Sequence, residues 1–543
     1  MAKKQTESDE PNPQAAEAAA PSANTADLPF AKELFDAADQ LRGSVESAEY
    51  KHLVLGLIFL KYISDSFERH RLRLDEQTRN PKSELFTESD KDRAEILEDR
   101  DEYTAENVFW VPEEARWPRL VESASQPDIG VKIDRALEMI ERENEVQLRG
   151  VLPQIYARSP LEPAKLGELV VTIAGVDFGA NDEQARDLLG RTYEYFIKAF
   201  ARSEGHRGGE FYTPRSITQV LVEMLEPYEG RVFDPACGSC GLFIQSAEFL
   251  RAHGSGTEKI SLYGQELNQA TWRIGRMNLA IHGLAGEVLL GDSLLDDKYP
   301  SLKADYVLAN PPFNMKKWGA AQVADDARWA FGSPPDSNAN FAWVQSFIHH
   351  LAPDGRAGFV LANGSLTASN KGEGAIRQKI IEQDLVDCIV ACPGQLFYTT
   401  QIPVCLWFLD RDKSSGDERD RSGETLFIDA RALGESISRT QIEFSEADVE
   451  RIVGTYHAWR GTNGEEYEDV AGFCASVTTG QIAEQGFVLT PGRFVGAEDT
   501  EEDQVEFEER MRGLTATLSE QLAESEGLSD EVKKALKAVG YEL

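Results

Sequence analysis

From Gly208 onward the sequence alternates short apolar or β-branched runs with stretches of helical periodicity. Strands that alternate with helices form βαβ units, which build a mainly parallel sheet with helices on both faces. The second half of the chain is therefore predicted to be an α/β domain. Its predicted strands are Arg231–Phe233, Ile260–Gly264, Glu287–Leu290, Ala304–Ala309, Ala357–Leu361, Val386–Val390 and Val404–Leu409. The polar stretch 410–424 is predicted to be a loop between two late strands.

The first half of the chain has a different texture, with apolar residues at three- and four-residue steps from Leu28 onward, which predicts helices. Residues 1–27 are rich in Ala, Pro, Ser, Glu and Asn and are expected to be a disordered leader. The predicted domains are a helical domain over 28–200, an α/β domain over 201–497 and a helical tail over 498–543. One apolar stripe marks the tail, formed by Phe507, Met511, Leu514, Leu518 and Leu522.

The charge of the chain restricts its partners. Its 93 Asp and Glu residues outnumber 56 Lys and Arg residues, and the net charge is −37. The mean field therefore repels nucleic acid and anionic membranes, so a DNA-binding role needs a local basic surface or a basic partner. Six cysteines in 543 residues favour a reducing compartment. The longest apolar run, Leu53–Leu60, is far shorter than the roughly 20 residues that span a bilayer, and we expect a cytoplasmic protein.

A glycine-containing turn follows the first predicted strand, in R-V-F-D-P-A-C-G-S-C-G (231–241). Glycine at Gly238 and Gly241 permits positive φ and lets a ligand approach the backbone closely. Ligands of open α/β sheets bind beside such turns, at the carboxyl ends of the strands. Neither a dinucleotide fingerprint nor a P-loop is present. The alternative is a strand-to-helix connection without a ligand.

Acidic residues end the next two predicted strands. Glu266 ends the second strand, where a carboxylate can accept hydrogen bonds from both hydroxyls of a ribose. Asp292 follows the third strand, where it could accept a hydrogen bond from the exocyclic amine of adenine. Either residue alone is also typical of a solvated strand end. Together with Asp234 they form a series of three acidic strand ends, which favours a nucleoside site.

The fourth predicted strand runs directly into Asn310, Pro311, Pro312 and Phe313. The two prolines fix φ and remove two N–H donors, so the turn is stiff and its carbonyls stay free as acceptors. Asn310 adds an amide oxygen, and Phe313 adds a ring for stacking. This combination suits a planar amine whose protons two acceptors take while an aromatic ring holds the base. The alternative is a rigid Pro-Pro turn without a ligand.

These motifs resemble those of the amino-methyltransferases, enzymes that methylate adenine N6 or cytosine N4 in DNA. N-P-P-F is similar to their catalytic motif, and D-P-A-C-G-S-C-G to their S-adenosylmethionine loop. G-E-F-Y-T-P (209–214) resembles the segment that closes over the methionine part of the cofactor, and the order of motifs is that of the γ class. Residues 41–65 and 486–496 are similar to segments of type I restriction–modification methylase (M) subunits. The resemblance covers roughly residues 30–500.

The resemblance implies a Rossmann-like, S-adenosylmethionine-dependent methyltransferase domain that acts on N6 of adenine and needs no metal. Asn310, Pro311, Pro312 and Phe313 are the expected catalytic residues, and Phe313, Tyr212 and Tyr398 the expected walls of the base pocket. The expected cofactor-binding residues are Phe211, Tyr212, Thr213, Asp234, Ala236, Gly238, Ser239, Gly241, Glu266, Leu267, Asp292, Ser293 and Asn310. The implied partners are double-stranded DNA and a specificity (S) subunit flanked by two M subunits, and the sequence leaves open whether a restriction (R) nuclease subunit joins.

One residue departs from the family pattern, since Cys240 stands where many relatives have glycine. Cysteine tolerates positive φ poorly, which bears on the local turn and on cofactor affinity. Several other functions stay open beside adenine methylation. They are cytosine N4 methylation, a catalytically silent scaffold, a DNA mimic, and a redox or zinc site built on Cys237 and Cys240. The scaffold and mimic readings leave the cofactor loop unexplained, and Cys388 and Cys392 have the wrong spacing to complete a zinc site.

Overall fold

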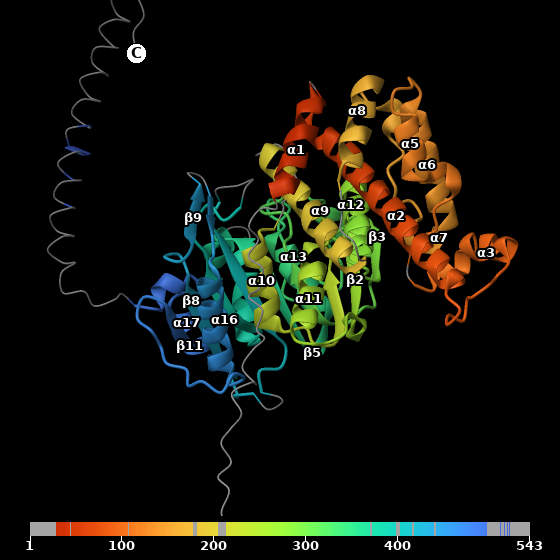
Figure 1. Cartoon of the computed structure of the whole chain (residues 1–543). Helices are drawn as coiled ribbons and strands as arrows, with labels where there is room; N and C mark the ends of the chain where they lie inside the picture. The colour runs from red at the N-terminus through yellow and green to blue at the C-terminus, as the bar shows by residue number, and fades with distance from the viewer. Residues whose placement is uncertain are drawn as a thin grey trace, which may run out of the picture.

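The computed structural model describes residues 29–43, 45–106, 108–176, 182–204, 213–369, 372–397, 402–414, 418–438 and 441–496, and five separate positions between 511 and 521. The expected leader and most of the expected tail lie outside the described residues. So do Phe211, Tyr212 and Tyr398, three of the expected site residues. Figure 1 shows a helical region packed against one end of an α/β region.

The N-terminal region consists of helices around a long central one. The helices are α1 (Pro29–Arg42), α2 (Ser47–Arg79), α3 (Asp90–Leu97), α4 (Arg100–Thr104), α5 (Trp117–Glu122), α6 (Ile129–Glu143), α7 (Glu145–Leu148), α8 (Pro163–Ala174) and α9 (Asp182–Glu204). The segment 53–60 of α2 is buried on all sides, which explains why its sequence is apolar nearly all round. None of the described helices has the length and hydropathy needed to cross a membrane.

A nine-stranded sheet forms the second region, and its core strands are those that the apolar runs predicted. The strands are β1 (Gly230–Asp234), β2 (Ile260–Glu266), β3 (Gly286–Leu290), β4 (Ala304–Ala309), β5 (Leu351–Ala362), β6 (Val386–Ala391), β7 (Val404–Asp410), β8 (Glu424–Asp429) and β11 (Cys474–Thr478). Their order is β11-β8-β6-β7-β5-β4-β1-β2-β3. All neighbours pair parallel except where β7 and β11 take part. A separate hairpin joins β9 (Glu435–Ser438) and β10 (Gln441–Glu443).

This strand order defines where a ligand can bind. The chain runs from β1 outward through β2 and β3, and then returns to place β4 on the other side of β1. Such a reversal is a topological switch point, and the carboxyl ends of the two strands beside it diverge to leave a crevice. Here the two strands end at Asp234 and just before Asn310. The fold therefore brings the glycine-containing turn and the proline turn to one crevice.

Helices cover both faces of the sheet. They are α10 (Arg215–Leu225), α11 (Gly241–Ala252), α12 (Gln269–Ile281), α13 (Asn340–His350), α14 (Gly364–Thr367), α15 (Glu373–Glu382), α16 (Glu446–Arg460) and α17 (Thr479–Glu484). Alternate residues of β6 enter different cores: Cys388 and Val390 pack with α10 and α16, and Ile389 packs with α13 and α15. This strand is buried along its whole length, as expected for a sheet covered on both faces.

Helix α12 connects the two regions (Figure 1). Its residues Ile274, Met277 and Ile281 belong to the hydrophobic core of the N-terminal helices. At its exposed edge, Arg273 Nε donates to the Gly150 carbonyl (3.1 Å), and an arginine one turn later makes a similar bond. The helical region and the sheet therefore share a continuous core at this helix.

The polar stretch after β7 is the predicted loop, but it is more buried than its composition indicates. Arg421 is 1% exposed, and it forms ion pairs with Asp387 (3.3 Å) and Asp410 (2.9 Å), both also buried. Lys413 is buried as well and pairs with Asp384 at 2.7 Å. Buried charges need partners because desolvation is costly. Here the basic side chains of the loop pair with acidic side chains in or beside the strands.

Candidate functional site

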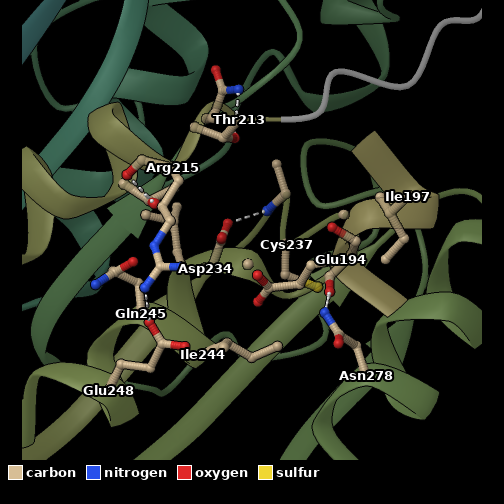
Figure 2. A pocket seen from close by; sticks show the side chains of 17 residues that line it. Glu194, Ile197, Thr213, Arg215, Asp234, Cys237, Ile244, Gln245, Glu248 and Asn278 are labelled. Carbon is tan, nitrogen blue, oxygen red and sulfur yellow. Dashed lines mark hydrogen bonds and ion pairs between the residues drawn. The ribbon is translucent and has the colours of Figure 1, made fainter. Parts of the chain in front are cut away.

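A cleft of about 680 Å³, counted with its open mouth, lies at the switch point between β1 and β4 (Figure 2). Its walls come from the turn after β1, the starts of α10 and α11, the residue after β4, and two more distant helices, α9 and α12. The lining residues are Glu194, Ile197, Thr213, Arg215, Thr218, Asp234, Ala236, Cys237, Gly238, Ser239, Gly241, Leu242, Ile244, Gln245, Glu248, Asn278 and Asn310. The structure thus gathers seven of the expected site residues around one cavity.

The turn from β1 to α11 forms the floor of the cleft. Gly238 has φ +53°, and a Cβ atom at Gly238 or Gly241 would point into open space. Cys240 also has positive φ, +62°, at the position where the family resemblance leads one to expect glycine. Its side chain is fully buried and stands close to Gly275 of α12. The turn therefore keeps the backbone shape that glycine would allow, and packing against α12 offsets the strain of a cysteine there.

Asp234 places a carboxyl group in this cleft almost without solvent contact. It is 2% exposed, and its Oδ1 accepts a hydrogen bond from the Ala236 N–H at 2.9 Å. Burial, with a smaller contribution from the nearby charge of Glu266, raises the pKa of Asp234 to about 8. A cation bound in the cleft would favour the ionised form, so the site is electrostatically suited to a positively charged ligand.

Asn310 faces the turn from the other side of the switch point. Its Nδ2 donates to Thr213 Oγ1 (2.9 Å), which fixes the orientation of the amide. The Oδ1 atom is buried and has no hydrogen-bond partner among the residues that the structure describes. A buried acceptor without a partner costs free energy, so a ligand with an N–H donor would be stabilised here. Phe313 packs edge-on against Phe397, with ring centroids 5.8 Å apart.

The proline turn is held from behind by α13. Asn314 has φ +54°, and Asn340 binds it twice: Asn340 Oδ1 accepts from the Asn314 N–H, and Asn340 Nδ2 donates to Asn314 Oδ1, both at 3.0 Å. Asn340 is 1% exposed. Asn340 thus fixes the end of the N-P-P-F segment.

Glu266 lies beside the cleft and supports the turn. Its Oε2 accepts from the Gly238 N–H (3.1 Å), and its Oε1 accepts from the Asn268 N–H (2.7 Å). Leu267, which follows it, is 61% exposed. Neither residue lines the cleft. The ribose contact expected of Glu266 stays a prediction, and Glu266 would make it from the outer side of the turn.

Asp292, the expected adenine contact, and Ser293, another expected cofactor-binding residue, also lie outside the cleft lining. Asp292 Oδ1 accepts from the N–H groups of Leu294 and Leu295, and Ser293 Oγ donates to the Pro235 carbonyl (2.5 Å). The buried guanidinium of Arg328 donates to the carbonyls of Ser293 and Leu294. This segment is therefore rigid and joined to the turn at Pro235.

The cysteine pair of the turn does not resemble a reactive redox site. Cys237 and Cys240 are both free and buried. A hydrogen bond between them, together with burial, raises the pKa of Cys237 well above its usual range. Reactive thiols have lowered pKa values, so the cofactor-loop interpretation is favoured over the redox one. The described residues contain no group of three potential metal ligands.

Comparison with known proteins identifies the family. Residues 184–503 match the family model described as N-6 DNA Methylase, and residues 30–173 match the HsdM N-terminal domain. The chain is 42% identical to the type I restriction enzyme MjaIX methylase subunit of Methanocaldococcus jannaschii, over 94% of this chain and 92% of that protein. It is 44% identical to the HindI methylase subunit of Haemophilus influenzae, over 80% and 100%. The chain belongs to the methylase subunits of type I restriction enzymes.

The fold agrees with this assignment. A solved methyltransferase subunit of a type I restriction–modification system from Streptococcus thermophilus superposes with a TM-score of 0.70 and 25% identity, covering 86% of this chain and 98% of that one. The resemblance seen in the sequence is thus confirmed, as is the α/β methyltransferase fold preceded by helices. This methylase subunit is a DNA methyltransferase.

Ten of the lining residues were not among the expected site residues, and three of these, Glu194, Ile197 and Asn278, come from helices far from the motifs. None lies in a strand-end motif, and each reaches the cleft through contact between helices. Asn278 also braces the turn, because its Nδ2 donates to the Ser239 carbonyl at 2.9 Å. The spacing of Glu194 within α9 carried no signal that separates it from a solvated glutamate.

Proposed function

We propose that this methylase subunit transfers the methyl group of S-adenosylmethionine to N6 of an adenine flipped out of DNA. One observation carries the proposal: the Asn310 Oδ1 acceptor is buried and unsatisfied in a cleft that also contains the Asp234 turn. An exocyclic amine supplies the donor that this atom lacks. The adenine must leave the helix, because N6 cannot be reached within stacked bases.

The residues of the cleft fit S-adenosylmethionine. This cofactor is cationic, and Asp234 is a buried carboxyl group whose ionised form a cation would stabilise. Open space above Gly238 and Gly241 admits a ligand close to the backbone. Glu266, at the adjoining strand end, suits the ribose hydroxyls, and Asp292 suits the adenine amine. When bound, the cofactor supplies an electrophilic methyl group.

The side chains of the proline turn have distinct tasks. Asn310 Oδ1 and the Pro311 carbonyl accept hydrogen bonds from the target amine, which makes its nitrogen lone pair available for attack on the methyl group. Thr213 keeps the amide of Asn310 in the orientation that directs Oδ1 away from it. Phe313 stacks on the base, and Tyr212 and Tyr398 are proposed as further walls. The rate then derives mainly from positioning and preorganised electrostatics.

The partners proposed for this subunit follow from its family and its charge. With a net charge of −37 the chain lacks the overall basic surface on which DNA affinity depends. A separate specificity subunit therefore selects the DNA site, with two methylase subunits flanking it, and a nuclease subunit is a further proposed partner. Solved and curated relatives that are named as subunits of type I restriction systems support a role for this chain in a complex with other subunits.

The test combines base identification with a substitution. DNA from a host that expresses this subunit with its specificity subunit is sequenced for modified bases, and we expect N6-methyladenine at one sequence context. Asn310→Ala should lower kcat by at least about 10²-fold, because one preorganised polar contact is lost, while cofactor affinity changes little. Methylation of cytosine N4 would replace the adenine proposal with its alternative. Near-normal turnover by the variant would refute the role of Asn310.

A further inference from the structure

One end of the cleft is formed by helices outside the motifs. Glu194 and Ile197 belong to α9, the last helix of the N-terminal region, and Asn278 belongs to α12. All three line the same cleft as Asn310. In Figure 2 they lie across the cleft from Arg215. The helical region therefore supplies part of the wall around the proposed cofactor.

Close packing between α9 and α12 fixes this end. A Cβ atom at Gly190 would come within 2.8 Å of the His282 ring, so glycine permits the close approach of the two helices. His282 Nε2 lies 3.9 Å from Glu194 Oε1. Since His282 comes one helical turn after Asn278, Glu194 and Asn278 are brought to facing positions.

Both side chains line the cleft and carry oxygen atoms that can accept hydrogen bonds. Asn278 is 2% exposed, and its Nδ2 is engaged by the Ser239 carbonyl. Its Oδ1 is buried and has no hydrogen-bond partner among the described residues. Glu194 adds a partly buried carboxylate. An ammonium group carries three donors and a positive charge, so it matches this pair of acceptors.

The opposite side of the cleft presents the complementary charge. Arg215, at the start of α10, forms an ion pair with Glu248 at 3.1 Å. A guanidinium group suits a carboxylate because it offers several donors in a plane. Acceptors on one side and a guanidinium on the other match the two charged groups of an α-amino acid.

We propose that Glu194 and Asn278 bind the α-ammonium group at the methionine end of the cofactor, with Arg215 toward its carboxylate. The inference rests on the proposed use of S-adenosylmethionine. It makes the last helix of the N-terminal region a direct participant in cofactor binding. The two unsatisfied acceptors of the cleft then have separate donors: Asn278 Oδ1 takes the ammonium group, and Asn310 Oδ1 takes the target amine.

Calorimetric titration of the full chain tests this with two probes. S-Adenosylhomocysteine carries the amino acid end, and 5′-methylthioadenosine lacks it. Glu194→Gln should weaken S-adenosylhomocysteine about tenfold or more, the usual effect of losing a hydrogen bond to a charged group. It should leave 5′-methylthioadenosine within about twofold. Glu138→Gln, an exposed change on α6 with the same loss of charge, should alter neither affinity.

A change in the ligand gives a second arm, and its first measurement needs only the wild-type chain. S-Adenosylhomocysteine without its amino group should bind wild type about tenfold more weakly, and Glu194→Gln should weaken that analogue no further. Unchanged binding of S-adenosylhomocysteine by the variant, equal weakening of both probes, or tight wild-type binding of the deaminated analogue would each overturn the inference. Failure of wild type to bind any adenosyl probe would instead refute the proposed function.

Discussion

At the scale of single residues, the clearest electrostatic feature of the site is the buried carboxyl group of Asp234. Its carboxyl group is buried at the end of the central strand, and burial raises its pKa to about 8. The folded chain therefore holds a proton that the unfolded chain releases near pH 4. Between these two pH values the unfolded state binds fewer protons, so the contribution of Asp234 to stability falls as pH rises.

Asp234→Asn should remove this pH dependence. Without ligand, the wild-type chain should lose stability as pH rises from 4 to 7, and the variant should not lose this contribution. The free energy of unfolding of the variant minus that of wild type should therefore increase by on the order of 4 kcal/mol over this range. Denaturant unfolding of both chains across that range measures the difference, and asparagine preserves the size of the side chain. Parallel stability curves would show that Asp234 is ionised in the folded, ligand-free chain.

The site residues that could be predicted from the sequence are those that lie at or just after the ends of strands. Asp234, Gly238 and Asn310 stand directly at strand ends, and parallel strands bring their carboxyl ends to one edge. Glu194 and Asn278 reach the cleft through contact between helices, which no local pattern encodes. The pKa of Asp234 was equally hidden, because it depends on burial rather than on the neighbouring residues in the chain.

At the scale of elements, α12 determines the position of the cofactor turn. One face packs in the core of the N-terminal helices, and the other touches the turn at Gly275. A Cβ atom at Gly275 would lie 2.7 Å from the Gly238 carbonyl oxygen and 2.8 Å from Cys240 Sγ. Either the turn or the helix must move to accept it.

Gly275→Ala should therefore weaken cofactor binding. Overpacking costs about 1–3 kcal/mol, and a displaced turn would show this as roughly a tenfold loss of affinity. Titration with S-adenosylhomocysteine measures it. The control is Gly454→Ala on α16, where nothing lies within 4 Å of the added Cβ. That change should stabilise the chain by about 0.5–1 kcal/mol and leave affinity unchanged. Equal affinities for all three chains would mean that α12 does not position the turn.

The polar stretch 410–424 tests a second element. Arg421→Ala would leave Asp387 and Asp410 buried with one partner fewer, and breaking such a pair costs about 3–5 kcal/mol. Denaturant unfolding should show this loss. Arg135→Ala removes an exposed pair with Glu114 and should have no measurable effect, since solvent screens it. Similar results for the two variants would contradict a structural role for the buried network.

Strands were predictable where apolar or β-branched runs alternate with stretches of helical periodicity. The seven runs that predicted strands correspond to β1–β7, and the late strand expected after the polar stretch 410–424 is β8, although no bounds were predicted for it. The strands β9, β10 and β11 were not predicted. β8 has only three consecutive apolar residues, Leu426–Ile428, and follows a polar loop. β11 (Cys474–Thr478) is an edge strand with small and polar side chains. Both strands are held by pairing with neighbouring strands, and this tertiary cause leaves a weak mark on the local sequence.

At the scale of the whole molecule, the net negative charge and the C-terminal segment both bear on the proposed association with a specificity subunit. The predicted apolar stripe of the tail lies mostly outside the described residues. At two of its described positions, Met511 and Leu518, the side chains are 47% and 56% exposed. Apolar side chains that solvent reaches are suited to pack against helices of another chain. We therefore propose that the stripe contacts the specificity subunit, and the alternative is that it folds back on its own domain.

Truncation after residue 497 should separate assembly from cofactor chemistry. The shortened chain should lose co-purification with the specificity subunit, because the apolar stripe is removed, and should keep its affinity for S-adenosylhomocysteine, because the cleft lies within residues 194–310. Met511→Glu with Leu518→Glu is the point-mutant counterpart, since two charges in a packed interface are costly. Affinity chromatography on a tagged specificity subunit measures assembly. Unchanged co-purification of both altered chains would place the contact elsewhere on the subunit, and loss of cofactor binding by the truncated chain would show that the tail supports the catalytic region itself.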